Sequence, residues 1–208
     1  MTGSDPRQEL LDAAVEYVAE HGLADLSLRR LASELGTSHR MLSHHFGSKD
    51  GMWAAIVNEV EHRQLAAFGD LGSDPSMSFE DVMRAWWRHL SDPALSANER
   101  LFFEVYVNAL RDQAASAEFL AGAVESWLAP ATGRLEAMGV SPERASAHAR
   151  LGLAVTRGLL LDLLATGDRT AVDVAMEQWI ALSAELVSAG GPRAALAPRG
   201  ATRRPSAG

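Results

Sequence analysis

The sequence predicts an all-α protein with two domains. Apolar residues recur at intervals of three and four over most of the chain, which is the pattern of amphipathic helices. Serine, aspartate or proline precedes these segments and glycine often follows them, as at helix starts and ends. No alternating run of β-branched residues with a hairpin turn is present.

Nine helices are expected. The first carries Leu10, Leu11, Ala14, Val15 and Val18 and ends at His21-Gly22. The next three begin after the caps Ser27, Thr37 or Ser38, and Ser48, and span residues 28–35, 39–44 and 49–68. After a predicted loop at 69–78, helices are expected over 79–90, 97–111, 117–138, 142–166 and 168–187, and Ser96 with Glu99 has the spacing of a capping box.

Composition indicates a globular protein that is not an enzyme. The chain has no cysteine, and it lacks the glycine-rich and nucleophile motifs of common catalytic sites, so we expect neither a cofactor nor a metal. The longest apolar stretch, residues 151–164, is interrupted by Arg157 and Asp162 and is shorter than the ~20 residues that span a bilayer. The first seven residues have no apolar core for a signal peptide. We therefore expect a cytoplasmic protein with no membrane partner.

Residues 27–49 have the pattern of a helix-turn-helix, a motif whose second helix enters the major groove of double-stranded DNA. Leu28, Leu31, Ala32 and Leu35 form the inner face of the first helix, and Met41, Leu42 and Phe46 are expected to anchor the second. Five polar residues are then left to point outward: Ser38, His39, Arg40, Ser43 and His44.

The charge of this segment favours DNA although the whole chain has a net charge of −8. Between residues 27 and 49 the only acidic residue is Glu34, whereas four residues are basic: Arg29, Arg30, Arg40 and Lys49. Local charge matters more than the total because electrostatic interactions decay over about 8–10 Å at physiological salt. We predict a DNA-binding domain over 1–50, a helical domain over 51–189 and a disordered basic tail over 190–208.

Residues 10–50 resemble the tetracycline-repressor (TetR) family of regulators. The resemblance rests on the leading helix, His21-Gly22, Ser27-Leu28, Leu31-Ala32, Leu35-Gly36, Ser38, Leu42, His45-Phe46 and Lys49. The segment Arg157–Asp162, followed by Gly167-Asp168, is similar to the actinobacterial branch of the family. Members are dimers that pair through their last two helices and bind a small effector in the C-terminal domain, so the resemblance implies a homodimer, a palindromic operator and an effector here.

The resemblance also assigns the DNA contacts. It implies that Ser27, His45 and Lys49 contact phosphates and that Ser38, His39 and Arg40 lie at or near the bases. Thr37 and His44 complete the predicted DNA-binding set. Ser43 is a departure, because the family usually has a tyrosine there that packs and reaches a phosphate. Serine is too short to do so, which puts the strength of backbone anchoring in question.

The C-terminal half contains candidate effector-binding residues on helices that are apolar around much of their circumference. They are Trp86, Phe102, Phe103, Tyr106, Asn108, Leu110, Trp127 and Arg157. Aromatic residues at helical spacing also form ordinary cores, and Arg157 has the alternative of pairing with Glu104 or Asp162. A small apolar or aromatic compound is the predicted ligand.

The last two helices carry small and apolar residues that suit a four-helix dimer interface. The predicted interface residues are Gly152, Val155, Gly158, Leu159, Val172, Ala175, Met176, Trp179 and Leu182. The alternative is that some of these faces pack inside the subunit.

Three functions fit the sequence. The first is a repressor that a small apolar effector releases from its operator. The second is an effector-independent DNA-binding regulator, in which the aromatic group is solid core. The third is a ligand-binding helical protein with a weakened DNA-binding domain, which the serine at position 43 supports.

Overall fold

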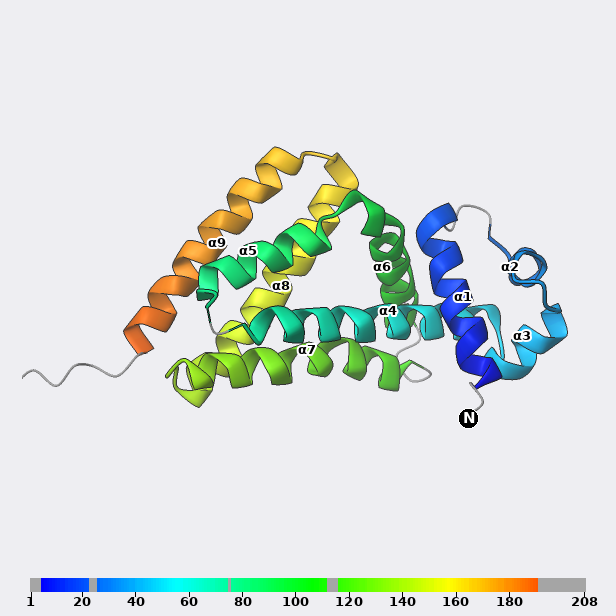
Figure 1. The fold of residues 1–208 in the computed structure, drawn as a ribbon, viewed down its shortest axis with the longest axis horizontal. Helices are drawn as coiled ribbons and strands as arrows, with labels where there is room; N and C mark the ends of the chain where they lie inside the picture. The colour runs from blue at the N-terminus through cyan, green and yellow to red at the C-terminus, as the bar shows by residue number, and fades with distance from the viewer. Residues whose placement is uncertain (1–4, 23–25, 75, 112–115, 191–208) are drawn as a thin grey trace, which may run out of the picture.

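The structure, a computed structural model, describes residues 5–22, 26–74, 76–111 and 116–190, and these residues form helices and short connections without a strand (Figure 1). The helices are α1 (Pro6–His21), α2 (Leu28–Glu34), α3 (His39–Phe46), α4 (Lys49–Gly72), α5 (Phe79–Leu90), the 3-10 turn η1 (Pro93–Leu95), α6 (Ser96–Arg111), α7 (Ala117–Ala137), α8 (Pro142–Thr166) and α9 (Arg169–Gly190). The all-α prediction is confirmed.

Most predicted helix starts coincide with observed caps. The side-chain oxygens of Ser27, Ser38 and Ser48 accept the backbone N–H groups of Arg30, Met41 and Gly51. Each bond satisfies a backbone donor that the helix itself leaves without a partner. Ser38 rather than Thr37 therefore caps α3.

Two local predictions differ from the structure. Helix α4 extends to Gly72, four residues into the predicted loop at 69–78, because Leu71 packs against the core formed by α5, α8 and α9. The capping box at Ser96 is also wrong: α6 follows directly on η1, and Glu99 is buried and bonded to Gln64 of α4. Residue 190 ends α9, and the rest of the predicted tail lies outside the described residues.

Helices α1–α3 share one core with the first half of α4. Leu11, Val18, Leu31 and Leu42 are buried together with α4 residues such as Ile56. This core continues into α6 and α7 through Leu101, Phe102, Val105 and Ala123. The helix-turn-helix is therefore packed onto the C-terminal half through α4. The hydrophobic core continues across residue 50, where the predicted domain boundary lies.

Helices α5–α9 enclose the second half of α4. In Figure 1, α7 runs alongside α4. Helix α9 packs against both α5 and α8. Polar contacts fasten α5 to α9: the Trp87 indole N–H donates to Asp173 at 2.6 Å, and Arg84 forms an ion pair with Glu177 at 2.9 Å.

The junction between α3 and α4 requires glycine at position 51. A Cβ there would overlap the backbone oxygen of Phe46, and that oxygen belongs to the end of α3 and cannot move independently. We predict that Gly51→Ala lowers the free energy of unfolding by about 1–3 kcal/mol. Thermal or urea unfolding measures this loss.

Gly69→Ala is the matched control, because Gly69 also lies inside α4 and has nothing within 4 Å of an added Cβ. Helix propensity should make that variant more stable by up to about 1 kcal/mol. Equal effects of the two substitutions would contradict the close approach at residue 51.

Candidate functional site

The first candidate site is the exposed face of α3. Leu42 and Phe46 are buried beneath the helix, and Leu28, Leu31 and Ala32 fix α2 in the same way. Gly36, with a φ of 64°, makes the turn between the two helices in a conformation that side-chain-bearing residues rarely adopt. The buried faces hold α3 with its opposite side toward solvent.

The exposed face carries most of the predicted DNA-contacting residues. Ser27, Ser38, His39, Arg40, His44 and Lys49 are exposed, whereas Thr37, Ser43 and His45 are half-buried. Met41 was expected to anchor α3 and instead is 45 % exposed, because it lies one position before the buried Leu42 and points away from the core. It joins the outward face beside Arg40.

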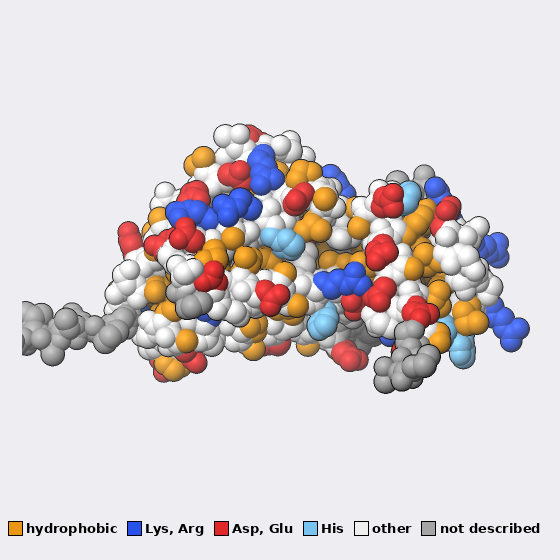
Figure 2. Space-filling view, in the orientation of Figure 1, with side chains coloured by type: hydrophobic (Ala, Val, Ile, Leu, Met, Phe, Trp, Pro, Cys, Tyr) orange, Lys and Arg blue, Asp and Glu red, His pale blue; other side chains and the backbone are white. Residues whose placement is uncertain are grey.

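Positive charge lies at this end of the molecule. Arg29, Arg30, Arg40 and Lys49 are all exposed, and Figure 2 shows basic side chains projecting from the end formed by α2 and α3. The Lys49 ammonium group lies 5.7 Å from the centre of the Trp53 ring, a cation–π contact that positions it at the start of α4.

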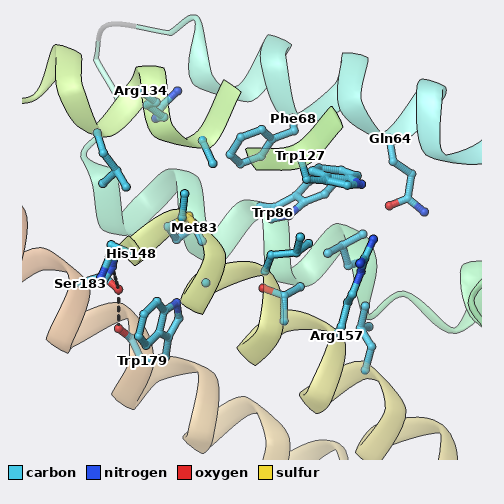
Figure 3. Close-up of a pocket in the computed structure, with 18 of the residues that line it drawn as sticks. Gln64, Phe68, Met83, Trp86, Trp127, Arg134, His148, Arg157, Trp179 and Ser183 are labelled. Atoms are coloured by element: carbon cyan, nitrogen blue, oxygen red, sulfur yellow. Dashed lines mark hydrogen bonds between the residues drawn. The ribbon is translucent and has the colours of Figure 1, made fainter. Parts of the chain in front are cut away.

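The second candidate site is a cavity of about 110 Å³ between α4 and the helices of the C-terminal half (Figure 3). Aromatic side chains form much of its wall: Phe68, Trp86 and Trp127 contact one another with ring centres 5.1–6.2 Å apart. The remaining wall includes Met83, Phe102, Leu153 and Trp179. This is a largely apolar space with a few polar groups, as small-molecule sites generally are.

One end of the cavity contains a network of buried charged groups. The Trp127 indole N–H donates to Glu61 at 2.6 Å, and a guanidinium nitrogen of Arg157 lies 3.7 Å from the same carboxylate oxygen. Arg157 also donates to the carbonyl of Ala123 and lies 4.7 Å above the Phe102 ring. The pairing partner of Arg157 is therefore Glu61 on α4, rather than Glu104 or Asp162.

The carboxyl group of Glu99 lies at the same end, 7 % exposed, and accepts a hydrogen bond from the Gln64 amide at 3.0 Å. Burial raises its pKa to about 7, with a further increase from the charge of Glu61. Burial also raises the pKa of Glu61 and lowers that of Arg157, in both cases opposed by the attraction between the two.

The other end of the cavity contains His148, Ser183 and Arg134 (Figure 3). A ring nitrogen of His148 lies 2.9 Å from the Ser183 hydroxyl, and the ring stacks on Trp179 with centres 4.7 Å apart. Burial lowers the pKa of His148, so the neutral ring is favoured. Arg134 has a buried Nε without a hydrogen-bond partner among the described residues.

The structure divides the predicted ligand-binding residues into two groups. Trp86, Phe102, Trp127 and Arg157 line the cavity, whereas Phe103, Tyr106, Asn108 and Leu110 do not. Asn108 and Leu110 are exposed on the outer face of α6, and Tyr106 lies behind the cavity under Arg157. A helix that is apolar around much of its circumference does not indicate which side faces a cavity.

Sequence reasoning missed the acidic lining residues. The sequence pattern assigned no role to Glu61 or Gln64 of α4, and it indicated a capping residue at Glu99. The available signal was their spacing from apolar residues: Gln64 lies four residues after Val60, and Glu99 lies three before Phe102, so each shares a helix face with a residue that is buried.

The predicted dimer residues are divided in the same way. Gly158, Ala175 and Leu182 are exposed, but Val172 and Met176 are 1 % exposed inside the subunit, and Gly152 and Trp179 line the cavity. Val155 and Leu159 pack partly buried against the inner core. The exposed faces of α8 and α9 instead present an apolar surface that we call the outer seam: Leu151, Ala154, Gly158, Leu161 and Ala165 on α8, and Ala171, Val174, Ala175 and Leu182 on α9.

The fold and these two sites define a helical protein with an N-terminal helix-turn-helix and a cavity in its C-terminal half. Residues 10–56 match the sequence profile described as "Bacterial regulatory proteins, tetR family". The N-terminal part of the chain is thus similar to the DNA-binding region of TetR-family regulators.

Curated relatives carry regulatory names. The chain is 35 % identical over 91 residues to the HTH-type transcriptional repressor AcnR of Corynebacterium efficiens, a match covering 41 % of this chain and 48 % of that protein. The matched segment thus spans about half the length of the curated relatives. These names are those of regulators rather than enzymes.

Solved structures match most of the chain. A transcriptional regulator from Rhodococcus sp. RHA1 gives a TM-score of 0.69 at 21 % identity and covers 89 % of this chain and 97 % of its own. The multidrug binding protein EbrR, solved with imidazole, gives a TM-score of 0.59 at 26 % identity and covers 86 % and 95 %. The predicted division into a helix-turn-helix and a helical C-terminal half therefore matches the known fold. Among the described residues, no helix has the length and apolarity to cross a membrane.

The buried Glu99 makes a testable contribution to stability. Because its pKa is raised from 4.5 to about 7 on folding, ionisation of Glu99 destabilises the fold as pH rises through this range. We predict that Glu99→Gln becomes more stable relative to the wild type by about 3 kcal/mol between about pH 5 and pH 8. Urea unfolding of both proteins across this range measures the difference.

Glu104→Gln, on the exposed side of the same helix, is the control and should show no such trend. A constant difference between Glu99→Gln and the wild type at all pH values would mean that Glu99 titrates normally.

Proposed function

We propose that this protein is a dimeric DNA-binding transcriptional repressor that a small, largely apolar effector releases from its operator. The observation that carries the proposal is the helix-turn-helix, in which buried Leu42 and Phe46 hold α3 with Arg40, His39 and His44 exposed. A helix presented in this way fits the major groove of B-DNA. The repressor names of the relatives support the same function.

The distribution of charge supports DNA as the partner. Exposed Arg40 can form a bidentate contact with guanine, and Lys49 at the start of α4 suits a phosphate. The acidic residues that make the whole chain negative lie mainly outside α2 and α3. A palindromic operator follows from a two-fold symmetric dimer, whose recognition helices must lie about 34 Å apart.

The outer seam supports dimerisation. Four large apolar side chains on it, Leu151, Leu161, Val174 and Leu182, are 51–67 % exposed in the single chain. On α8 the seam residues follow one another at alternating steps of three and four, the spacing of helices that pack lengthwise. Two copies of α8 and α9 would form a four-helix interface.

Helix α4 supports coupling between the cavity and the DNA-binding end. Glu61 and Gln64 on α4 contact the polar groups of the cavity, and Arg63 between them forms ion pairs with Asp12 of α1 at 2.6 Å and with Glu59 at 2.8 Å. A ligand that displaces Glu61 or Gln64 would therefore shift α4 and α1 together. That motion would change the spacing of the two recognition helices.

An apolar effector suits the cavity wall. A cavity of about 110 Å³ is close to the ~150 Å³ that accommodates benzene in an engineered core. The multidrug binding protein EbrR, which shares this fold, has been solved with ethidium and with imidazole.

Selection of bound sequences from random DNA tests the proposal. The full chain should enrich a palindrome, bind it with a strong dependence on salt, and release it when a cavity-binding compound is added. Failure to enrich any sequence would refute the DNA-binding function. Enrichment of a site that no cavity ligand releases would instead favour an effector-independent regulator.

Substitution of Arg40 and substitution of Lys49 should weaken DNA binding in different ways. We predict that Arg40→Ala weakens operator binding by about 1–3 kcal/mol and relaxes preference at one base pair. Lys49→Ala should weaken binding to all sequences alike and lower the salt slope by about one per subunit. Titrations on operator and scrambled DNA at several salt concentrations distinguish the two, and equal losses of specificity would contradict the assignment.

Gly158→Arg should separate the subunits. Gly158 is exposed, and nothing lies within 4 Å of an added Cβ, so the single chain accommodates the substitution. At a dimer seam the new charge would be buried without a partner, at a cost of several kcal/mol. Light scattering should show a monomer with little operator binding.

The control is Gly122→Arg, at an equally open and exposed position on α7 away from the outer seam. It should remain dimeric. A dimer in both variants would locate the interface on another surface.

A further inference from the structure

The polar end of the cavity has more negative than positive charge. Glu61 and Glu99 are both carboxyl groups, and Arg157 is the cation beside them. Glu61 is paired with Arg157 and bonded to the Trp127 indole. Glu99 has only the neutral amide of Gln64 as a hydrogen-bond partner and forms no ion pair among the described residues.

We propose that the effector is a small aromatic monocation whose charged group pairs with the carboxylate of Glu99 while its ring lies against the aromatic wall. The inference rests on the proposed function, because it takes the cavity to be the effector site. It adds the charge and chemical class of the ligand and the residue that selects it.

Geometry favours a cation over a neutral hydrogen-bond donor at this place. Glu99 is only 7 % exposed, so an unpaired negative charge on its carboxylate is costly. A monocation beside it would balance the two carboxylates and one guanidinium of this end. Ligand binding would therefore stabilise a charge that the folded chain leaves without a counterion.

The aromatic wall suits the same ligand. Phe68, Trp86 and Trp127 form a contiguous group of rings, and the Trp127 indole reaches the carboxylate end through its bond to Glu61. Arg157 already lies over Phe102 at 4.7 Å, so a cation on an aromatic face is an arrangement found at this end of the cavity. Tryptophan rings bind cations better than other aromatic side chains do.

The opposite end does not offer a competing negative charge. Arg134 lies there against the backbone of Gly72, at the C-terminal end of α4 where the helix dipole is negative. His148 is favoured in its neutral form by burial and by the nearby charge of Arg144. The ligand is thus oriented, with its cationic group at Glu99 and its apolar part toward Trp179.

The cavity, at about 110 Å³, is smaller than the ~150 Å³ that holds benzene in an engineered core, so a ligand with one ring and a short chain must widen it on binding. A second cavity of about 250 Å³ shares Leu90, Glu99 and Leu160 with the first. Arg100 and Arg169 line this second cavity together with Asp92, so its charge does not favour an extension of the cation past Glu99.

Three matched probes test the charge of the ligand: 2-phenylethylammonium, 2-phenylethanol and phenylacetate. Calorimetry on the full wild-type chain at about pH 8, where Glu99 is ionised, should give an affinity at least about tenfold higher for the cation than for the alcohol. Phenylacetate should bind most weakly. Quenching of tryptophan fluorescence reports occupation of the aromatic wall.

Two variants identify the residue responsible. Glu99→Gln keeps a polar side chain beside Gln64, and it should lose about tenfold in affinity for the cation while its affinity for the alcohol stays within about twofold. Glu104→Gln, exposed on the same helix, should leave both affinities unchanged. Thermal melting of each variant without ligand verifies that it is folded.

The dependence of affinity on pH provides a readout that a structural role of Glu99 would not produce. Cation binding requires the ionised carboxylate and releases a proton, so wild-type affinity for 2-phenylethylammonium should fall by up to about tenfold per unit as pH drops below about 7. Glu61, Arg157 and Gln64 face the same carboxyl group and remain in Glu99→Gln, which should show a flat profile.

The outcomes separate this inference from the proposed function. Equal or tighter binding of phenylethanol or phenylacetate in the cavity would overturn the cationic class and leave the effector site in place. Absence of binding by all three probes would overturn both the cationic effector and the cavity as an effector site. Operator binding by the same preparation would in that case keep the DNA-binding function.

Discussion

The structure depends on helix α4 belonging to two cores at once. Its first half, with Met52, Trp53 and Ile56, closes the core of the helix-turn-helix, and its second half, with Phe68, joins the aromatic wall of the cavity. A single helix cannot shift at one end without consequence at the other, because its backbone hydrogen bonds make it stiff over several turns. The exposed face of α3 and the cavity are linked through this one element.

Buried polar and charged side chains connect α4 to the other helices around the cavity. Glu61 and Gln64 on α4 bond to Trp127 on α7, Arg157 on α8 and Glu99 on α6. Such groups cost free energy to bury, so their interactions contribute less to net stability than to selecting one arrangement of helices. A ligand in the cavity would lie beside these contacts, which join α4 to α6, α7 and α8. Recognition of the ligand and control of α4 would therefore involve the same side chains.

The two long C-terminal helices also have two faces with different surroundings. One face of α8 and α9 contributes Gly152, Arg157 and Trp179 to the cavity wall. The opposite face is the outer seam, where Val174 is 67 % exposed. Subunit pairing and ligand binding would thus act on the same helices from opposite sides. For this reason, a ligand in the cavity would change the distance between the α3 helices of the two subunits.

The sequence by itself determined the helices, the helix-turn-helix and most of its outward face. These features arise from local interactions: the caps at Ser27, Ser38 and Ser48, the turn at Gly36, and the periodicity that buries Leu42 and Phe46. Met41 was assigned to the wrong side because an apolar residue next to the buried face is ambiguous when one position covers about 100°.

Only the tertiary structure decided which sides of the C-terminal helices meet. Glu99 was read as a cap and Glu61 was given no role, yet both lie in the cavity, since α4, α6 and α8 converge there from positions far apart in the chain. Trp179 and Met176 were assigned to a dimer face and instead fill the interior. A helix that is apolar around most of its circumference can bury any of several faces, so its local sequence does not decide which face is buried. Contacts with distant parts of the chain decide it.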